Sequence, residues 1–423
     1  MKDYSLFIND LSKLISFKST LSQKQDGAPF GTEVKKALNF FLDKASEMGF
    51  ETINYDNYIG EVIFGDGEEI GIIGHLDVVP TGIGWNTDPF TLTKIDGVYY
   101  GRGIQDDKAP LLACLYALKE LKDSCIAPKR KFRLIVGCNE ESGWQDVEYM
   151  QKKTHLPEFG FSPDGNFPLS YAEKGILLVK IALPELKNFF SLKGGTAVNA
   201  VCDYASVVAK DGGIDLELIK KHGLKLGDGN LIESFGKAAH GSSPELGLNA
   251  LKPLFEYFYA MGEDVLSIVN LFNDTNNISS LYSEQGKVTL SPDLIEEKDG
   301  KLFLTCDCRI PAPISTKSVE EILDKYGFTY STTEKHPTFM VEKDSFLVQT
   351  LIGAYNAVTG ENAHPISMGG STFARAFKHG CAFGPEFIGH DAKIHDANEN
   401  LPEELLLKYY EIYKTAIFEF AKN

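Results

Sequence analysis

The stretch GIIGHLDVVP, residues 71–80, decides the fold of this chain. An apolar run of strand length ends at His75, and Asp77 follows two positions later. A run this apolar is typical of a strand that is covered on both faces, as in a parallel sheet. Because side chains alternate with period two, His75 and Asp77 point to the same side. We therefore expect a buried strand that ends in an imidazole and a carboxylate.

The segments around this strand alternate between helix and strand patterns. Residues 32–50 and 107–124 have helical apolar spacing, residues 53–65 alternate like a strand pair, and residues 129–137 form a second buried strand. This rhythm predicts an α/β domain with a mostly parallel sheet and helices on both faces.

The pattern changes after residue 175. Residues 176–342 offer several strands, a hairpin around 296–311 and two helices, at 252–272 and 318–327, which is an α+β pattern. After residue 342, the alternation of helix and strand patterns seen in the first part of the chain returns. The sequence thus predicts one domain, residues 1–175 plus 343–423, interrupted by an inserted domain at 176–342.

Composition excludes several classes of protein. The net charge of −17 over 423 residues argues against nucleic acid as a partner. Seven scattered cysteines fit a reducing cytoplasm better than a disulfide framework. We expect a cytoplasmic protein with no membrane partner, because no segment approaches a membrane span and the N-terminus lacks a signal-peptide pattern.

Two further motifs place carboxylates at the ends of predicted elements. GRGIQDDKAP (101–110) contains Asp106 and Asp107 directly before a helix, where they could simply cap it. GCNEESGW (137–144) puts Glu140 and Glu141 after the second buried strand, at the sheet edge where α/β proteins bind ligands. A solvated turn is the alternative there.

The last two motifs are SPDGNFP (162–168), with Asp164 in a turn, and IHDANENLP (394–402), with His395 before the final helix. Each motif alone has an ordinary explanation as a turn or a surface residue. Together they give an ordered set of nitrogen and oxygen ligands without thiolate, which suits Zn²⁺, Co²⁺ or Mn²⁺. A set of this size predicts two metal ions that share a carboxylate and a water.

These five motifs resemble the metal-site motifs of the M20 co-catalytic metallopeptidases, in the family's order and across essentially the whole chain. GGTAVNAVCD (194–203), KAAHGSSPELGLNA (237–250) and MGGSTFARAF (368–377) are similar to the PepV-like dipeptidase branch. The resemblance implies a zinc-peptidase-like catalytic domain with a ferredoxin-like lid and two divalent cations, Zn²⁺ first. It also implies a cis peptide between Asp106 and Asp107.

The resemblance further implies a role for each residue. His75 and Asp164 would bind the first metal, Glu141 and His395 the second, and Asp106 would bridge both. Asp77 would orient His75, and Glu140 would be the general base that activates a metal-bridging water. In the inserted domain and after it, substrate contacts would come from Asn199, His240, Arg309, Gly369, Gly370, Ser371 and Thr372, with His240 facing the oxyanion and Arg309 the substrate carboxylate.

Some alternatives stay open from sequence. His390 could replace His395 as the ligand, although the spacing from His395 to Glu399 matches the family better. The substrates would be small dipeptides, and the rivals are an N-acyl-amino-acid amidohydrolase, a non-catalytic metal-binding homologue or a solvated acidic rim. The long insert favours a monomer over a dimer.

Overall fold

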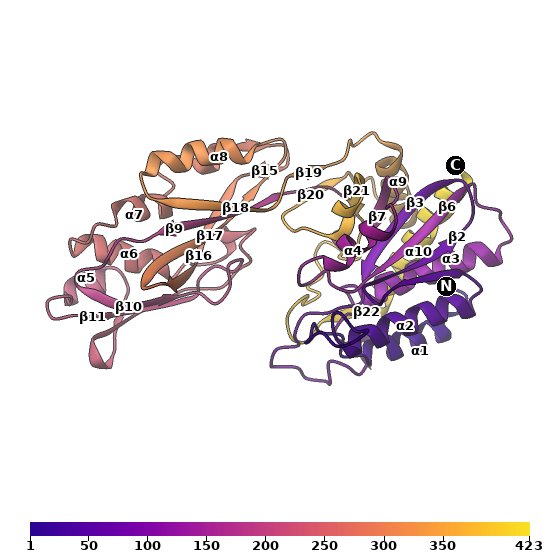
Figure 1. Cartoon of the computed structure of the whole chain (residues 1–423), viewed down its shortest axis with the longest axis horizontal. Helices are drawn as coiled ribbons and strands as arrows, with labels where there is room; N and C mark the ends of the chain where they lie inside the picture. The colour runs from indigo at the N-terminus through magenta and orange to yellow at the C-terminus, as the bar shows by residue number, and fades with distance from the viewer. The chain divides into compact units, whose positions relative to one another are not determined.

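Residues 1–423 are described by a computed structural model, which divides into two compact units (Figure 1). The first unit comprises residues 1–171, 340–366 and 371–423, and the second comprises 172–339 and 367–370. The unit borders thus lie within four residues of the boundaries expected from sequence, and residues 367–370 join the second unit in addition. None of the helices combines the length and the apolar character that crossing a membrane requires.

The first unit is built on one sheet with a parallel centre. Strands β6 (Arg130–Gly137), β3 (Glu68–His75), β7 (Phe159–Ser162) and β21 (His379–Ala382) run parallel in this order. Antiparallel strands flank them: β2 (Ile59–Phe64) and β1 (Glu51–Tyr55) on one side, β8 (Ser170–Glu173) on the other. The predicted α/β class with a mostly parallel sheet is confirmed.

Helices cover both faces of this sheet. Helix α2 (Thr32–Glu47) packs on β1 and β2, while α3 (Lys108–Asp123) packs on β3 and on α10 (Glu403–Lys422), which also contacts α9 (Phe346–Thr359). On the opposite face, α4 (Gln145–Lys153) contributes Val147 and Met150 to a buried cluster with Ile73 and Ile135 of the strands. Helix α1 (Tyr4–Ile15), which sequence patterning did not single out, packs on α3.

A small second sheet of the first unit links distant parts of the chain. Its strands are β22 (Asn400–Pro402), β5 (Val98–Tyr100) and β4 (Thr93–Ile95). The pairing of Asn400 with Tyr100 brings the loop after β5 next to the segment before α10. Two of the sequence motifs, 101–110 and 394–402, therefore become neighbours.

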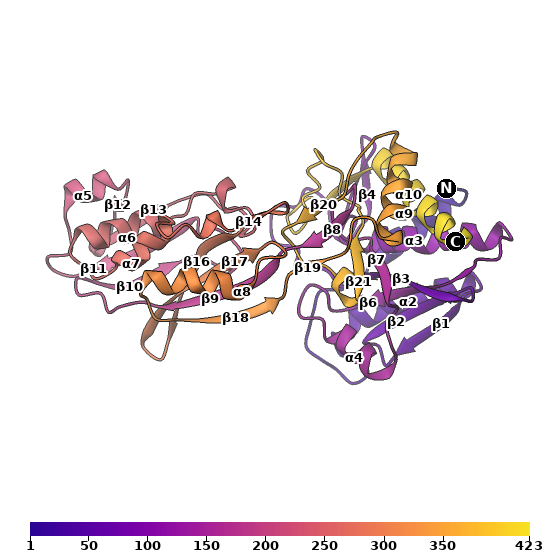
Figure 2. The same cartoon turned by 90° about the horizontal axis from the view of Figure 1, so that it is seen from above.

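The second unit has the ferredoxin-like strand order expected for the insert. Strands β16 (Thr289–Lys298), β17 (Lys301–Ile310), β9 (Gly175–Ala182) and β18 (Tyr330–His336) form an antiparallel sheet in this order. Helix α8 (Thr316–Leu323) lies over β18 (Figure 2), where Thr332 donates a hydrogen bond to Glu320. The helix expected at 252–272 is divided into α6 (Leu251–Ala260) and α7 (Leu266–Phe272), because Gly262 adopts a positive φ of 86°.

An additional antiparallel sheet completes the second unit. It consists of β10 (Phe189–Gly194), β11 (Tyr204–Ala209), β13 (Leu231–Phe235) and β12 (Lys225–Leu226). The remaining elements of this unit are short: α5 (Leu216–Lys221), β14 (Tyr282–Ser283) and β15 (Gly286–Lys287). Strands β19 (Phe339–Met340) and β20 (Ile366–Met368) instead join the large sheet, where both pair with β8. One continuous core, which includes Leu177, Val207 and Leu254, joins both sheets of this unit to its helices.

Replacing Gly71 of β3 by alanine should destabilise the first unit. A Cβ at this position would lie 2.3 Å from the ring of Phe377, so the ring or the strand would have to shift. We expect the free energy of unfolding to fall by about 1–3 kcal/mol, measured by urea denaturation. The matched control is Gly353→Ala in α9, where a Cβ meets nothing within 4 Å. This change should instead stabilise the helix by up to about 1 kcal/mol. Equal stability of the two variants would contradict the packing described here.

Candidate metal centre

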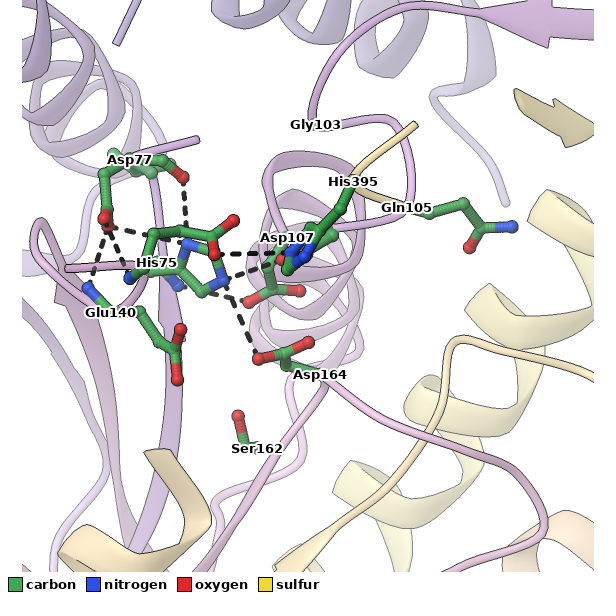
Figure 3. Close-up of polar contacts among 12 residues, drawn as sticks. His75, Asp77, Gly103, Gln105, Asp107, Glu140, Ser162, Asp164 and His395 are labelled. Carbon is green, nitrogen blue, oxygen red and sulfur yellow. Dashed lines mark hydrogen bonds and ion pairs between the residues drawn. The ribbon is translucent and has the colours of Figure 1, made fainter. Parts of the chain in front are cut away.

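The carboxyl ends of β3 and β6 bring two of the sequence motifs, 71–80 and 137–144, to one edge of the sheet. His75 pairs with Gly137, so both strands end at the same level. The loop after β6 then turns back, and the backbone N–H groups of Glu140 and Glu141 donate to the two carboxylate oxygens of Asp77, each over 3.1 Å (Figure 3). Asp77 therefore fixes the position of both glutamates.

The His75 ring is buried and held in one orientation. Its Nδ1 lies 2.9 Å from the main-chain oxygen of Asp77 and 3.5 Å from the carboxylate of the same residue. The ring is thus oriented by the carbonyl of Asp77, while the carboxylate is engaged by the glutamate loop. Because Nδ1–H donates to this carbonyl, the lone pair of Nε2 points into the site.

Asp106 lies between two imidazoles. Its Oδ1 is 2.9 Å from Nε2 of His75, and its Oδ2 is 2.9 Å from Nε2 of His395. Asp164 approaches His75 Nε2 to 3.7 Å, and Glu141 approaches His395 Nε2 to 3.3 Å. The peptide that joins Asp106 to Asp107 is cis, as the resemblance implies. One carboxylate therefore faces two separate nitrogen ligands.

These distances fit divalent cations. Ligand atoms at 2.0–2.2 Å from a tetrahedral ion are about 3.3–3.6 Å apart. Two overlapping groups have ligand atoms within 4.8 Å of one another: His75 with Glu140 and Asp164, and His75 with Asp106 and Glu141. Carboxylate oxygens and an imidazole lone pair that converge in a buried place repel one another unless a cation lies between them. The donor set thus matches a metal site.

The electrostatics of the site reflect this crowding of negative charge. Burial raises the pKa of Glu140 well above its usual value, with Asp164 adding to the effect and His75 opposing it. Burial also raises the pKa of Glu141 to about 7. For His75, burial favours a lower pKa, but the neighbouring carboxylates outweigh it and raise the pKa well above its usual value. In the metal-free protein, protons would take the place of cations.

Comparison with known proteins identifies the family. The sequence profile of Peptidase family M20/M25/M40 matches residues 71–419. A Beta-Ala-Xaa dipeptidase from Lactobacillus delbrueckii subsp. lactis is 32% identical, over 98% of this chain and 96% of the relative. The chain belongs to the M20 peptidase family.

Two solved structures share the M20 fold. The di-peptidase Dug1p of Saccharomyces cerevisiae has a TM-score of 0.61 at 17% identity, over 99% of this chain and 96% of that one. A dinuclear metal-binding peptidase of the M20 family from Bacillus subtilis has a TM-score of 0.54 at 12% identity, with 98% of each chain covered. The family expected from the motifs is confirmed, and with it a centre that binds metal ions.

The fold brings seven candidates of the first unit together within this site: His75, Asp77, Asp106, Glu140, Glu141, Asp164 and His395. His390, the alternative to His395, faces the carbonyl of Asn400 at 3.5 Å instead of the carboxylates. Ser371 and Thr372 also belong to the first unit. There the hydroxyl of Thr372 caps a short 3-10 helix by accepting from Ala374 N–H.

The second-unit candidates also lie close to one another. The N–H of Gly241 donates to the carbonyl of Asn199 over 2.7 Å, which places His240 beside Asn199. Arg309 donates from Nη1 to the carbonyl of Gly369 over 2.7 Å, and Nε and Nη2 donate to the buried carboxylate of Asp307. A Cβ on Gly241 would lie 2.5 Å from that carboxylate, so the Asn199–Gly241 contact and the Arg309–Asp307 pair are packed together.

Sequence reasoning missed the role of Glu399, which organises the loop that carries Asp106. Its fully buried carboxylate accepts from Arg102 and from the backbone N–H groups of Gly103, Gln105 and Asp106. The spacing from His395 to Glu399 was visible as a family signal. The role of the Glu399 carboxylate was not visible, because its hydrogen-bond donors are nearly 300 positions away in the chain.

Metal binding should release protons and tighten as the pH rises. Without metal, neighbouring carboxylates raise the pKa of both His75 and His395, so the imidazoles keep their protons at neutral pH. Metal requires them neutral, so we expect at least one proton to leave per chain, and about tenfold tighter Zn²⁺ binding per pH unit between pH 6 and 8. Calorimetry in two buffers of different ionisation enthalpy measures the proton count. His390→Ala should bind like the wild type, and a proton count of zero would contradict the site described.

Proposed function

We propose that this protein is a dipeptidase that works with two divalent cations held by the residues of the metal centre. The observation that carries the proposal is the position of Asp106, with one carboxylate oxygen 2.9 Å from each of two imidazoles. A carboxylate with a different partner on each oxygen is the arrangement that a two-metal site requires. The dinuclear metal-binding peptidase with the same fold supports this reading.

The proposed ligand set follows from the contacts. His75, Asp106 and Asp164 would hold one ion, and Asp106, Glu141 and His395 the other. The set contains only nitrogen and oxygen, so Zn²⁺ is the proposed metal, with Co²⁺ and Mn²⁺ as the alternatives that share these ligand preferences. The cytoplasmic location and the monomeric state stay predictions from cysteine usage and insert length.

Bound cations would supply Lewis acidity, by polarising the scissile carbonyl and lowering the pKa of a water held there. The proton transfers fall to Glu140. Its backbone is fixed by Asp77, its carboxylate reaches the ligand group of His75 and Asp164, and burial keeps its proton affinity high. Glu140 therefore can take the proton of the attacking water and pass it to the leaving amine.

The second unit is proposed to hold the substrate. His240 would donate to the oxyanion, Asn199 would position the peptide and Gly370 would be a further donor, while Ser371 and Thr372 of the first unit would add hydroxyl donors. Arg309 is prepared for a carboxylate. Asp307 occupies one edge of the guanidinium and Gly369 one more N–H, which leaves two of its five N–H groups for the substrate's free carboxylate.

A dipeptide also needs a group for its free amine. Asp77 is unsuited to this role because both of its oxygens accept backbone N–H groups. Asp164 remains a candidate, and Glu386 joins it. The backbone of Glu386 pairs with Gly165 and Phe167 next to Asp164, and burial together with Asp164 and Asp106 raises the pKa of its carboxyl to about 7.

The variants Glu140→Gln and Glu141→Gln should distinguish the residue that acts as the base from a residue that binds metal. Glu140→Gln should lower kcat at least about a thousandfold while metal content, measured by elemental analysis, stays at the wild-type level. Glu141→Gln removes one charged ligand and should lose metal. Wild-type turnover in Glu140→Gln would refute its role as base, and full metal occupancy in Glu141→Gln would refute its role as a ligand.

A substrate panel separates the dipeptidase from the amidohydrolase reading. The metal-loaded enzyme should cleave Ala-Ala and β-Ala dipeptides, in line with the name of the Beta-Ala-Xaa dipeptidase relative. N-acetyl-alanine and N-succinyl-alanine, which lack the free amine, should be cleaved at least about a hundredfold more slowly. Faster cleavage of the acylated amino acids would favour an N-acyl-amino-acid amidohydrolase instead. If none of these compounds were hydrolysed, the protein would be a non-catalytic homologue.

A further inference from the structure

Asp146, in the first turn of α4, joins that helix to the loop that carries Glu140. Its Oδ2 accepts the backbone N–H of Cys138 over 2.7 Å and that of Asn139 over 2.9 Å. Its Oδ1 accepts the N–H of Val147 over 2.8 Å. One carboxylate therefore holds both the first residues of the loop and the helix that follows it.

The Asp146 carboxylate has no exposed surface, and its hydrogen-bond donors are all backbone N–H groups. Burial raises the pKa of this carboxyl to about 7, the charge of Asp77 adds to the effect, and the three N–H groups oppose it. A buried carboxylate without a cationic partner is costly to the fold. A place where the chain carries such a cost is one where a functional constraint is expected.

Asp77 continues the same row of hydrogen bonds. Its Oδ1 accepts the N–H of Glu140 (Figure 3), and its Oδ2 accepts that of Glu141. Four successive backbone N–H groups, at residues 138–141, thus donate to two buried carboxylates. The main chain is therefore held at every residue between the end of β6 and the proposed base.

The turn between the glutamates and α4 is closed by Asn139. Its main-chain oxygen accepts from the N–H of Trp144 over 2.9 Å, and its Oδ1 accepts from the N–H of Gln145 over 3.1 Å. Because Asp146 holds the N–H of Asn139 and also the helix, both ends of this turn depend on the same carboxylate. Asp77, by contrast, holds only the two glutamates between these ends.

We propose that Asp146 is a positioning residue, which places the carboxylate of Glu140 through the main chain of this loop. The inference rests on the proposed dipeptidase function. There Glu141 has a second anchor, because its carboxylate would bind a metal ion, whereas Glu140 as the base has only its main chain. Displacing a reacting group by about 1 Å can cost about a hundredfold in rate. Loss of the Asp146 carboxylate should therefore lower kcat and leave metal content and substrate binding in place.

The first test is Asp146→Asn, which keeps the shape of the side chain. Its NH₂ group cannot accept a hydrogen bond, so at least one of the three N–H groups loses its acceptor. We expect kcat of the metal-loaded enzyme for Ala-Ala to fall about tenfold, with KM within about twofold of the wild type and an unchanged metal content. Asp146→Glu keeps the charge but displaces the carboxylate by one methylene. It should lower kcat by a similar factor, and it replaces Asp146→Asn in the test if that variant does not fold.

Two further variants of the same helix are the controls. Glu148→Gln removes an exposed carboxylate from the same first turn and should leave kcat unchanged. Met150→Ala removes a side chain from the buried cluster under α4, so it should lower the urea midpoint of unfolding and leave kcat within about twofold of the wild type. If kcat fell as far in Met150→Ala as in Asp146→Asn, activity would follow stability alone and the proposal would be overturned.

A double-mutant cycle with Glu140→Gln decides whether Asp146 acts through the base. Without the base carboxylate, Asp146→Asn should change the residual kcat by less than about twofold, against about tenfold in the wild-type background. Equal factors in the two backgrounds would overturn the proposal. So would a wild-type kcat in Asp146→Asn, or a loss of metal from that variant. If the metal-loaded wild type cleaves no dipeptide at all, the proposed function itself fails.

Discussion

The burial of several carboxylates around one pair of imidazoles is the constraint on which the rest of this structure depends. Like charges that converge away from water are unstable unless cations or protons neutralise them. Here Asp106 stands between His75 and His395, and Glu141 and Asp164 complete the two sides. The surrounding fold holds these groups in place: Asp77 fixes the glutamate loop and Glu399 fixes the aspartate loop.

Much of this site could be predicted from sequence because its parts are local. His75 and Asp77 follow from a buried strand with period two, and Glu140 and Glu141 follow from the end of a parallel strand. The strand order of the second unit also followed, since the family resemblance covers the whole chain. What remained hidden depends on partners far away in the chain. The carboxylate of Glu399 finds its donors at Gly103 to Asp106 only because β22 pairs with β5.

Two further differences from the sequence expectations have local physical causes. The expected helix at 252–272 is interrupted because Gly262 adopts a conformation that other residues rarely adopt, and a single glycine within a helical pattern is a weak signal. The orienting contact of His75 comes from the main-chain carbonyl of Asp77. Side-chain patterns cannot reveal which oxygen of a residue a histidine will choose, because every residue carries a carbonyl.

The placement of His395 and Glu399 has a consequence for biogenesis. Both residues come from the last part of the chain, whereas His75, Asp106 and Glu141 are synthesised before the whole second unit. A nascent polypeptide must therefore complete the inserted unit before its early carboxylates can meet their last partners. Until then, the centre lacks the imidazole of His395, and no carboxylate of Glu399 is present to hold the loop that carries Asp106. A chain that stops translation before residue 395 would lack both His395 and Glu399 and would emerge with an unfinished active site.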